Sequence, residues 1–174
     1  FLFLFSGSVY GEEIEVEKEF FDSGELYTES HYNKKTKELL QTKWDRSGRL
    51  YQKFHYNKET KEGLETTWDE SGNKRLESHF KNGAKDGLET SWYESGKKAG
   101  ETHFKNGGRE GLDTSWYESG IKKEEISYVN WRVEGVWTTW YEFGRKQFEW
   151  NYKNGKEEGL STSWWENGTK KEEE

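Results

Sequence analysis

A tryptophan recurs every 24 residues along most of the chain, with no change of spacing. The series comprises Trp44, Trp68, Trp92, Trp116, Trp140 and Trp164. A glycine follows each tryptophan after four residues, at Gly48, Gly72, Gly96, Gly120, Gly144 and Gly168. A fixed period of this size is the signature of a repeat protein, in which each copy buries its apolar surface against its neighbours. We therefore expect about seven copies of one small unit, the first and last degraded.

Two further series keep the same interval. One places a glycine before an aliphatic residue, at Gly63-Leu64, Gly87-Leu88, Gly111-Leu112, Gly135-Val136 and Gly159-Leu160. The other places a histidine before an aromatic residue, at His31-Tyr32, His55-Tyr56, His79-Phe80 and His103-Phe104. Each repeat thus has a fixed turn position, a fixed aliphatic position and a fixed aromatic position.

The alternation of side chains within one repeat is that of a β-hairpin. Leu88, Thr90 and Trp92 alternate with polar or amphipathic neighbours, which predicts a strand with one apolar face. Residues 94–96 then make a tight reversal, and Gly96 suits the left-handed position of a three-residue hairpin turn. The same reasoning applies to the other five glycines of this series.

The return strand completes the predicted core of each repeat. If Tyr93 lies opposite Lys97, Thr102 and Phe104 point toward the face of Trp92. Only 29% of the residues are hydrophobic but 17% are aromatic, so aromatic rings must supply most of the buried area. The predicted core consists of the six tryptophans of the series with Leu64, Leu88, Leu112, Leu160, Phe80 and Phe104.

These patterns predict an all-β protein. Consecutive hairpins should form a solenoid-like antiparallel meander of about seven 24-residue β-hairpin repeats, joined in one elongated, twisted sheet. We expect residues 12–174 to form a single domain of such repeats. Residues 1–11 are apolar and end in small residues, so they are either the remnant of a signal peptide or an N-terminal cap strand. The first interpretation predicts export from the cell, and no segment is long enough to cross a bilayer as a helix.

Charge and composition exclude several classes of function. The net charge of −7, with lysines interleaved among glutamates, argues against a nucleic-acid partner. The absence of cysteine excludes disulfides and thiolate chemistry. Equivalent histidines of successive repeats should lie about 9.6 Å apart, too far to share a metal ion, so we expect no metal site. Reactive groups are reiterated along the chain and no catalytic motif is present, so we expect no catalytic residues, no cofactor and no enzyme activity.

The fifth repeat departs from the sequence pattern that the other repeats share. Trp131 replaces the turn glycine of the other copies, and Trp137 replaces an acidic residue. Phe143 replaces a serine of the hairpin tip, and Phe148 and Trp150 enlarge the return strand. Because clustered aromatic residues often mark interfaces, these five are the candidate partner-binding residues. The alternative is local drift, with Trp131 and Trp137 packing on each other or under the C-terminal segment.

The segments 103–107, 110–112 and 116–120 resemble the MORN-repeat variant found in bacterial proteins of the YwqK-type antitoxin family. The resemblance covers roughly residues 12–170, and the first two turns depart from it because Asn33-Lys34 and Asn57-Lys58 replace an Asn-Gly pair. A more distant resemblance is to choline- and glucan-binding repeats. The MORN resemblance implies a β-hairpin solenoid with a non-enzymatic, interaction-type role.

The function that we expect is binding, as a protein-binding, surface-adhesion or scaffold module with an aromatic-bearing sheet face. One alternative is a carbohydrate- or choline-binding surface module, because sugars and quaternary ammonium groups stack on aromatic rings. Another is an antitoxin or immunity protein, which would be cytoplasmic. A protein partner is expected first, then a glycan, and end-to-end self-association through open sheet edges is a further expectation.

Overall fold

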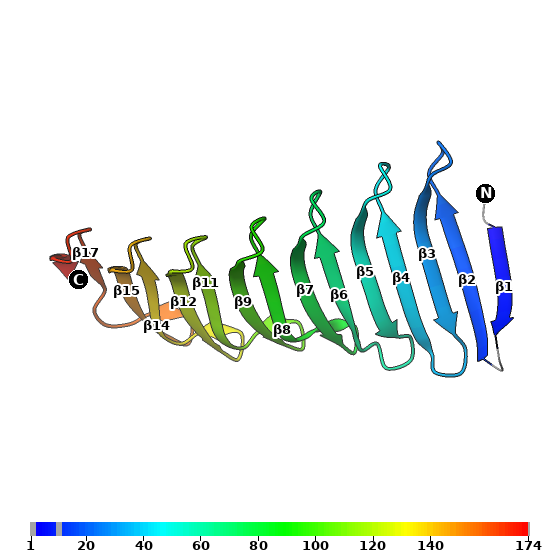
Figure 1. Ribbon diagram of the computed structural model, residues 1–174. Helices are drawn as coiled ribbons and strands as arrows, with labels where there is room; N and C mark the ends of the chain where they lie inside the picture. Colours follow the sequence, from blue (N-terminus) through cyan, green and yellow to red (C-terminus); the bar gives the residue numbers. More distant parts are fainter. Residues whose placement is uncertain (1–2, 10–11, 174) are drawn as a thin grey trace. The chain divides into compact units, whose positions relative to one another are not determined.

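The computed structural model describes residues 3–9 and 12–173, with side chains for residues 14–173 (Figure 1). The chain divides into two compact units, Phe1–Ala84 and Lys85–Glu174. Strands and turns make up the described residues, and there is no helix among them. The prediction of an all-β repeat protein is confirmed.

The strands follow one another in chain order. Those of the first unit are β1 (Phe3–Val9), β2 (Glu12–Phe20), β3 (Leu26–Asn33), β4 (Glu38–Trp44), β5 (Leu50–Asn57), β6 (Gly63–Trp68) and β7 (Lys74–Lys81). The others are β8 (Ala84–Trp92), β9 (Lys98–Lys105), β10 (Gly108–Arg109), β11 (Gly111–Trp116), β12 (Lys122–Val129), β13 (Arg132–Val133), β14 (Gly135–Trp140), β15 (Lys146–Lys153), β16 (Lys156–Glu157), β17 (Thr162–Trp164) and β18 (Lys170–Glu173).

Each unit is an antiparallel meander of β-hairpins. In the first unit β1 to β7 pair in sequence, and in the second unit β9, β11, β12, β14, β15 and β17 do the same, with short strands in the connections. Within a unit the hairpin tips lie along one edge and the connecting loops along the other (Figure 1). The segment 3–9 forms the strand β1, and residues 1, 2, 10 and 11 lie outside the described part.

A β-bulge in each hairpin decides which side chains share a face of the sheet. In the hairpin of β8 and β9, Trp92 pairs with Lys98 but Ser91 pairs with Gly100. Ala99 is therefore an extra residue on the return strand, and the same register shift recurs in the other six hairpins. A shift of one residue exchanges the two faces of the return strand.

The bulge corrects one prediction from the sequence. Tyr93 does close the turn with Lys97, but beyond the bulge Leu88 lies opposite His103. The expectation that Thr102 and Phe104 share the face of Trp92 is therefore wrong. In each unit, one face carries the tryptophan and histidine series and the other carries Phe80 or Phe104 and their neighbours; we call them the tryptophan face and the phenylalanine face.

Burial in this single layer is shared by both faces. Among the described residues, the buried apolar side chains are Leu39 and Ile126, and both lie on the phenylalanine face. The six tryptophans of the series are half-buried. Leu112 and Leu160, which we expected in the core, are 46% and 58% exposed, so that part of the core prediction is wrong. These leucines lie near the loop edge, where neighbouring side chains cover them poorly.

The connecting loops take two forms. In the second unit the turn at Asn106 and Gly107 has φ values of 50° and 85°, the conformation of a two-residue type I′ hairpin. In the first unit the loop 57–62 is wider, because the side-chain carbonyl of Asn57 accepts hydrogen bonds from the amides of Glu59 and Thr60 at 2.9 and 3.0 Å. The loop is therefore wider where Asn-Lys replaces Asn-Gly, but the strands that follow pair in the same order.

Hydrogen bonds between successive repeats couple both edges of the second unit. At the tips, the hydroxyl of Tyr117 donates to the carbonyl of Trp140 at 2.8 Å, and that of Tyr141 donates to Trp164 at 2.9 Å. At the loops, the carboxylate of Glu110 accepts from the amide of Asn130 at 2.8 Å. Each repeat therefore positions the next one through its own side chains, in addition to the pairing of strands.

Candidate functional site

The aromatic residues of the fifth repeat fall into three places. Trp137 lies on β14 and Phe148 and Trp150 on β15, all on the phenylalanine face of the second unit. Trp131 lies in a connecting loop, and Phe143 lies in the hairpin tip at the opposite edge. The structure thus brings together three of the five candidate residues and separates the other two.

The three residues form a cluster with Tyr152, a ring that the sequence analysis did not single out. Trp137 lies directly opposite Trp150, and their ring centroids are 5.2 Å apart. Trp137 and Tyr152 are 5.8 Å apart, and Phe148 and Trp150 stack at 5.0 Å with an angle of 14°. All four are half-buried. We call Trp137, Phe148, Trp150 and Tyr152 the fifth-repeat aromatic patch.

Hydrogen bonds hold the rings of this patch in place. The indole Nε1 of Trp137 donates to Oε1 of Glu124 at 2.9 Å. The hydroxyl of Tyr152 donates to Oε1 of Glu157 at 2.9 Å. Burial raises the pKa of Tyr152, and the bond to Glu157 raises it further, so the hydroxyl stays protonated at neutral pH. The patch is therefore a preorganised surface of fixed aromatic rings.

A small cavity adjoins the patch. It has a volume of about 120 Å³ and is lined by Phe148 and Trp150 on one side and by Ser161, Thr162, Ser163 and Glu172 on the other. Stacked rings beside hydroxyl and carboxylate groups offer both an apolar platform and hydrogen-bonding partners. This part of the patch has the composition of a site for a small polar ring or for a side chain of a partner.

Trp131 lies against the preceding loop and has no ring contact with Trp137. Its indole Nε1 donates to the carbonyl of Lys105 at 3.2 Å, and its backbone has a φ of 67°. The side chain is 61% exposed. Phe143 is 52% exposed and stacks on Tyr141 at 5.2 Å, within its own hairpin tip. Neither ring extends the patch.

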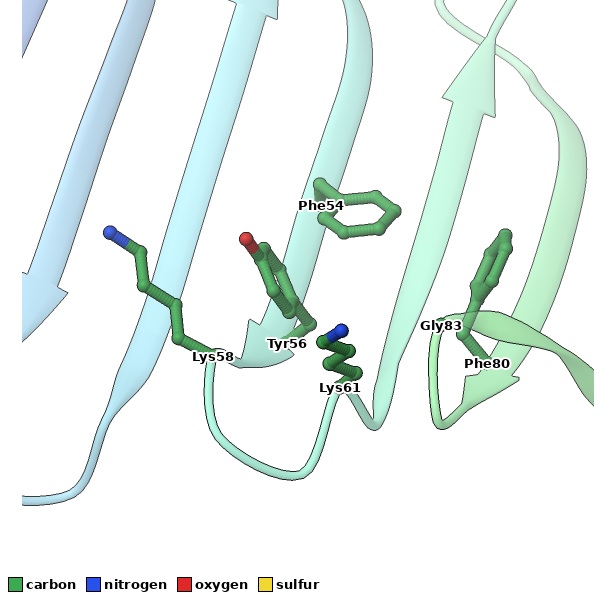
Figure 2. A pocket seen from close by; sticks show the side chains of 6 residues that line it. All are labelled: Phe54, Tyr56, Lys58, Lys61, Phe80 and Gly83. Carbon is green, nitrogen blue, oxygen red and sulfur yellow. The ribbon is translucent and has the colours of Figure 1, made fainter.

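The first unit contains an aromatic pocket that the sequence analysis missed. Phe54 and Tyr56 on β5 and Phe80 on β7 surround an open space of about 330 Å³, which Lys58, Lys61 and Gly83 also line (Figure 2). Phe54 is 5.0 Å from Tyr56 and 5.8 Å from Phe80. The sequence signal was present at Phe54, because the next three repeats have Ser78, Thr102 and Ile126 at this position.

Cations of the chain itself lie over three tryptophans of the series. The ammonium groups of Lys98, Lys122 and Lys146 lie 5.7, 5.3 and 5.8 Å from the ring centroids of Trp116, Trp140 and Trp164 respectively. Each of these lysines also pairs with a glutamate on its own strand. A quaternary ammonium ligand would have to displace these lysines, so this arrangement favours a structural role for these three tryptophans.

The histidine series makes local contacts. Nε2 of His31 lies 2.5 Å from Oε1 of Glu29, Nε2 of His55 lies 3.1 Å from Oε2 of Glu38, and Nδ1 of His103 lies 3.0 Å from the carbonyl of Leu112. Among the residues with described side chains, no three histidines or carboxylates gather closely enough to hold a metal ion. Over the described ranges, the structure also has no helix that could span a membrane.

One family model matches the chain, and its description is the MORN repeat variant. The matched segments are residues 16–34, 61–82, 85–106, 109–130 and 133–154. No curated protein matches the chain. The finer resemblances, to YwqK-type antitoxins and to choline- and glucan-binding repeats, stay predictions.

Proposed function

Since the chain belongs to the family of the MORN repeat variant, we propose that it is a non-enzymatic scaffold that binds a protein partner through the fifth-repeat aromatic patch. Repeats of this family commonly serve as protein- or membrane-binding modules and are typically non-catalytic. The observation that carries the proposal is the cluster of Trp137, Phe148, Trp150 and Tyr152 on one face of a single-layer sheet.

Large rings held in fixed positions suit a binding site. Aromatic residues provide much contact area at a low entropic cost, since their few rotatable bonds are already fixed by packing and by the bonds to Glu124 and Glu157. The other repeats of the second unit have Glu89, Asp113 or Ser161 where Trp137 stands, so the repeat fold does not require an indole there. A ring that the fold does not require is available for recognition.

The test uses exchanges that the repeat itself tolerates. Trp137→Glu and Trp150→Thr restore residue types found at the equivalent positions Glu89 and Thr102. Trp131→Gly restores the turn glycine and serves as the matched control outside the patch. We expect capture of a protein partner to be lost in the first two variants and kept in the third. Equal capture by all variants would overturn the proposed site.

A carbohydrate is the second candidate ligand, and the cavity beside Phe148 and Trp150 favours it. The hydroxyls of Ser161 and Ser163 can donate or accept hydrogen bonds with a sugar stacked on these rings, and the carboxylate of Glu172 can accept them. A glycan array distinguishes the two ligands. If the protein binds a defined glycan and Trp150→Thr abolishes that binding, the ligand of the patch is a carbohydrate and not a protein. Export, surface adhesion and the antitoxin alternative stay predictions, and a neighbouring toxin gene would favour the last.

A further inference from the structure

The pocket of Phe54, Tyr56 and Phe80 in the first unit lies outside the fifth-repeat aromatic patch and differs from it in charge. Figure 2 shows the three rings and the side chain of Lys61 around one opening, with Lys58 on the far side of Tyr56. The rings meet edge-on or tilted, at 67° for Phe54 and Tyr56 and at 58° for Phe54 and Phe80. A further aromatic ring can pack against such edges and faces.

The cations at this pocket are free of carboxylate partners. Across the described side chains, neither Lys58 nor Lys61 forms an ion pair, and the ammonium of Lys58 lies 4.1 Å from the ring centroid of Tyr32. The neighbouring lysines Lys37 and Lys81 do have partners, at 4.0 and 3.9 Å. In the second unit, Lys85, Lys98, Lys122 and Lys146 each pair with a glutamate. The pocket therefore attracts anions and repels cationic ligands.

The loop edge around the pocket adds to this positive charge. Residues 34–38, residues 58–62 and Lys81 contribute six lysines and three glutamates, in a chain whose net charge is −7. A local excess of positive charge thus surrounds an apolar opening. Charge complementarity at such an edge steers a negatively charged partner toward the pocket.

We propose that this pocket binds an acidic peptide segment of a partner, which inserts one aromatic side chain between Phe54, Tyr56 and Phe80. Glutamate or aspartate residues beside that ring pair with Lys58 and Lys61. A volume of about 330 Å³ suits a single side chain or a small group. An anionic bilayer fits less well, because Glu59 and Glu62 on the same loop are 69% and 53% exposed and would face the lipid headgroups.

The pocket is a feature of this one repeat. The wide loop 57–62 places Lys58 and Lys61 beside β5. The loop 33–38 has the same wide form but follows Ser30 in place of Phe54, and later loops have Asn82 or Asn106 in a two-residue turn. Phe54 is replaced by Ser78 in the next repeat, so the hairpin folds without a ring at this position. The combination of ring, loop and charge is therefore specific to the site and does not follow from the repeat.

The experiment is a titration of the full chain, labelled with ¹⁵N, with the blocked peptide acetyl-Gly-Glu-Phe-Glu-Glu-Gly-amide. In low salt we expect the amide signals of Tyr56, Lys61 and Gly83 to shift, with a dissociation constant on the order of 0.1 to 1 mM, typical of one anchored side chain. Phe54→Ser should weaken binding at least about tenfold and Lys61→Gln about threefold to tenfold. Raising the salt concentration should weaken binding as well.

Matched controls distinguish the pocket from general charge attraction. Lys53→Gln removes the same charge as Lys61→Gln, but from the tryptophan face of β5, so it should leave the affinity unchanged. A peptide with alanine in place of phenylalanine should not bind. The proposal is overturned if the peptide shifts no signal at the pocket, if Lys53→Gln and Lys61→Gln weaken binding equally, or if anionic vesicles bind there and the peptide does not. Variants of the fifth-repeat aromatic patch should bind the peptide normally, so the two proposals fail independently.

Discussion

The indole of Trp131 lies directly over Gly108, in the loop of the preceding repeat. A Cβ atom at Gly108 would stand 2.3 Å from Cδ1 of Trp131, which is far closer than van der Waals contact. The equivalent positions in neighbouring repeats are Ala84, Arg132 and Lys156, so Gly108 is the copy that lacks a side chain. The exceptional tryptophan and the exceptional glycine are therefore complementary.

This relationship predicts a specific effect of Gly108→Ala. The added methyl group must displace the indole, which loses its packing and the hydrogen bond to the carbonyl of Lys105. We expect a loss of about 1 kcal/mol in the free energy of unfolding and a shift of the indole N–H resonance of Trp131. Urea unfolding and a ¹⁵N–¹H spectrum measure the two effects.

The matching control is the double variant with Trp131→Gly. Without the indole, the methyl group at residue 108 meets no ring, so Gly108→Ala should cost much less in this background. A double-mutant cycle measures the coupling between the two positions. Additive effects would show that the indole does not occupy the position over Gly108 in solution.

A second prediction concerns the tyrosine that links two hairpin tips. Burial raises the pKa of Tyr117, and the negative charge of Glu142 raises it further, so its hydroxyl can donate to the carbonyl of Trp140 at neutral pH. Tyr117→Phe should therefore lower the free energy of unfolding by about 1 kcal/mol. Tyr32→Phe is the control, since the described structure gives its hydroxyl no hydrogen bond, and a similar loss in both variants would contradict this role.

A third prediction concerns stability at alkaline pH. Burial, together with the hydrogen bond to Tyr27, raises the pKa of Tyr51 to about 12, above the usual tyrosine value of about 10. The folded state resists ionisation of Tyr51 more than the unfolded state does, so the raised pKa contributes to stability. This contribution is fully present below pH 10 and is lost as the pH rises toward 12. Urea unfolding between pH 9 and 12 should show a decline that is shallower in Tyr51→Phe. An identical decline in both proteins would assign the loss to other groups.

The period of the tryptophan series was enough to predict the fold, because the turn and apolar positions of a hairpin repeat recur at the same interval in the sequence. The assignment of faces failed at Ala99, since the bulge depends on a single extra residue that hydrophobic periodicity does not reveal. The prediction that Phe104 lies with Trp92 failed for that reason alone. Residue patterns give the strands reliably but give the register only when the bulge is known.

The candidate site was predicted in part. Trp137 located the patch, because it breaks the polar pattern of Glu89 and Asp113, and Phe148 and Trp150 added large rings at positions that vary between the copies. Tyr152 was missed since an aromatic residue is normal at its position. The pocket at Phe54 was missed because its rings come from different strands and its lysines from a loop, so no short segment of the sequence contains the site.

The most direct test of the proposed function is quantitative capture with three immobilised proteins: the natural chain, Trp137→Glu and Trp131→Gly. Each is incubated with a lysate of the cells that produce the protein, and bound proteins are quantified by mass spectrometry. We predict at least one protein that is enriched on the natural chain and on Trp131→Gly, and at least about tenfold depleted on Trp137→Glu. The same bound proteins on all three columns, or loss on Trp131→Gly alone, would contradict the assignment of the binding site to the fifth-repeat aromatic patch.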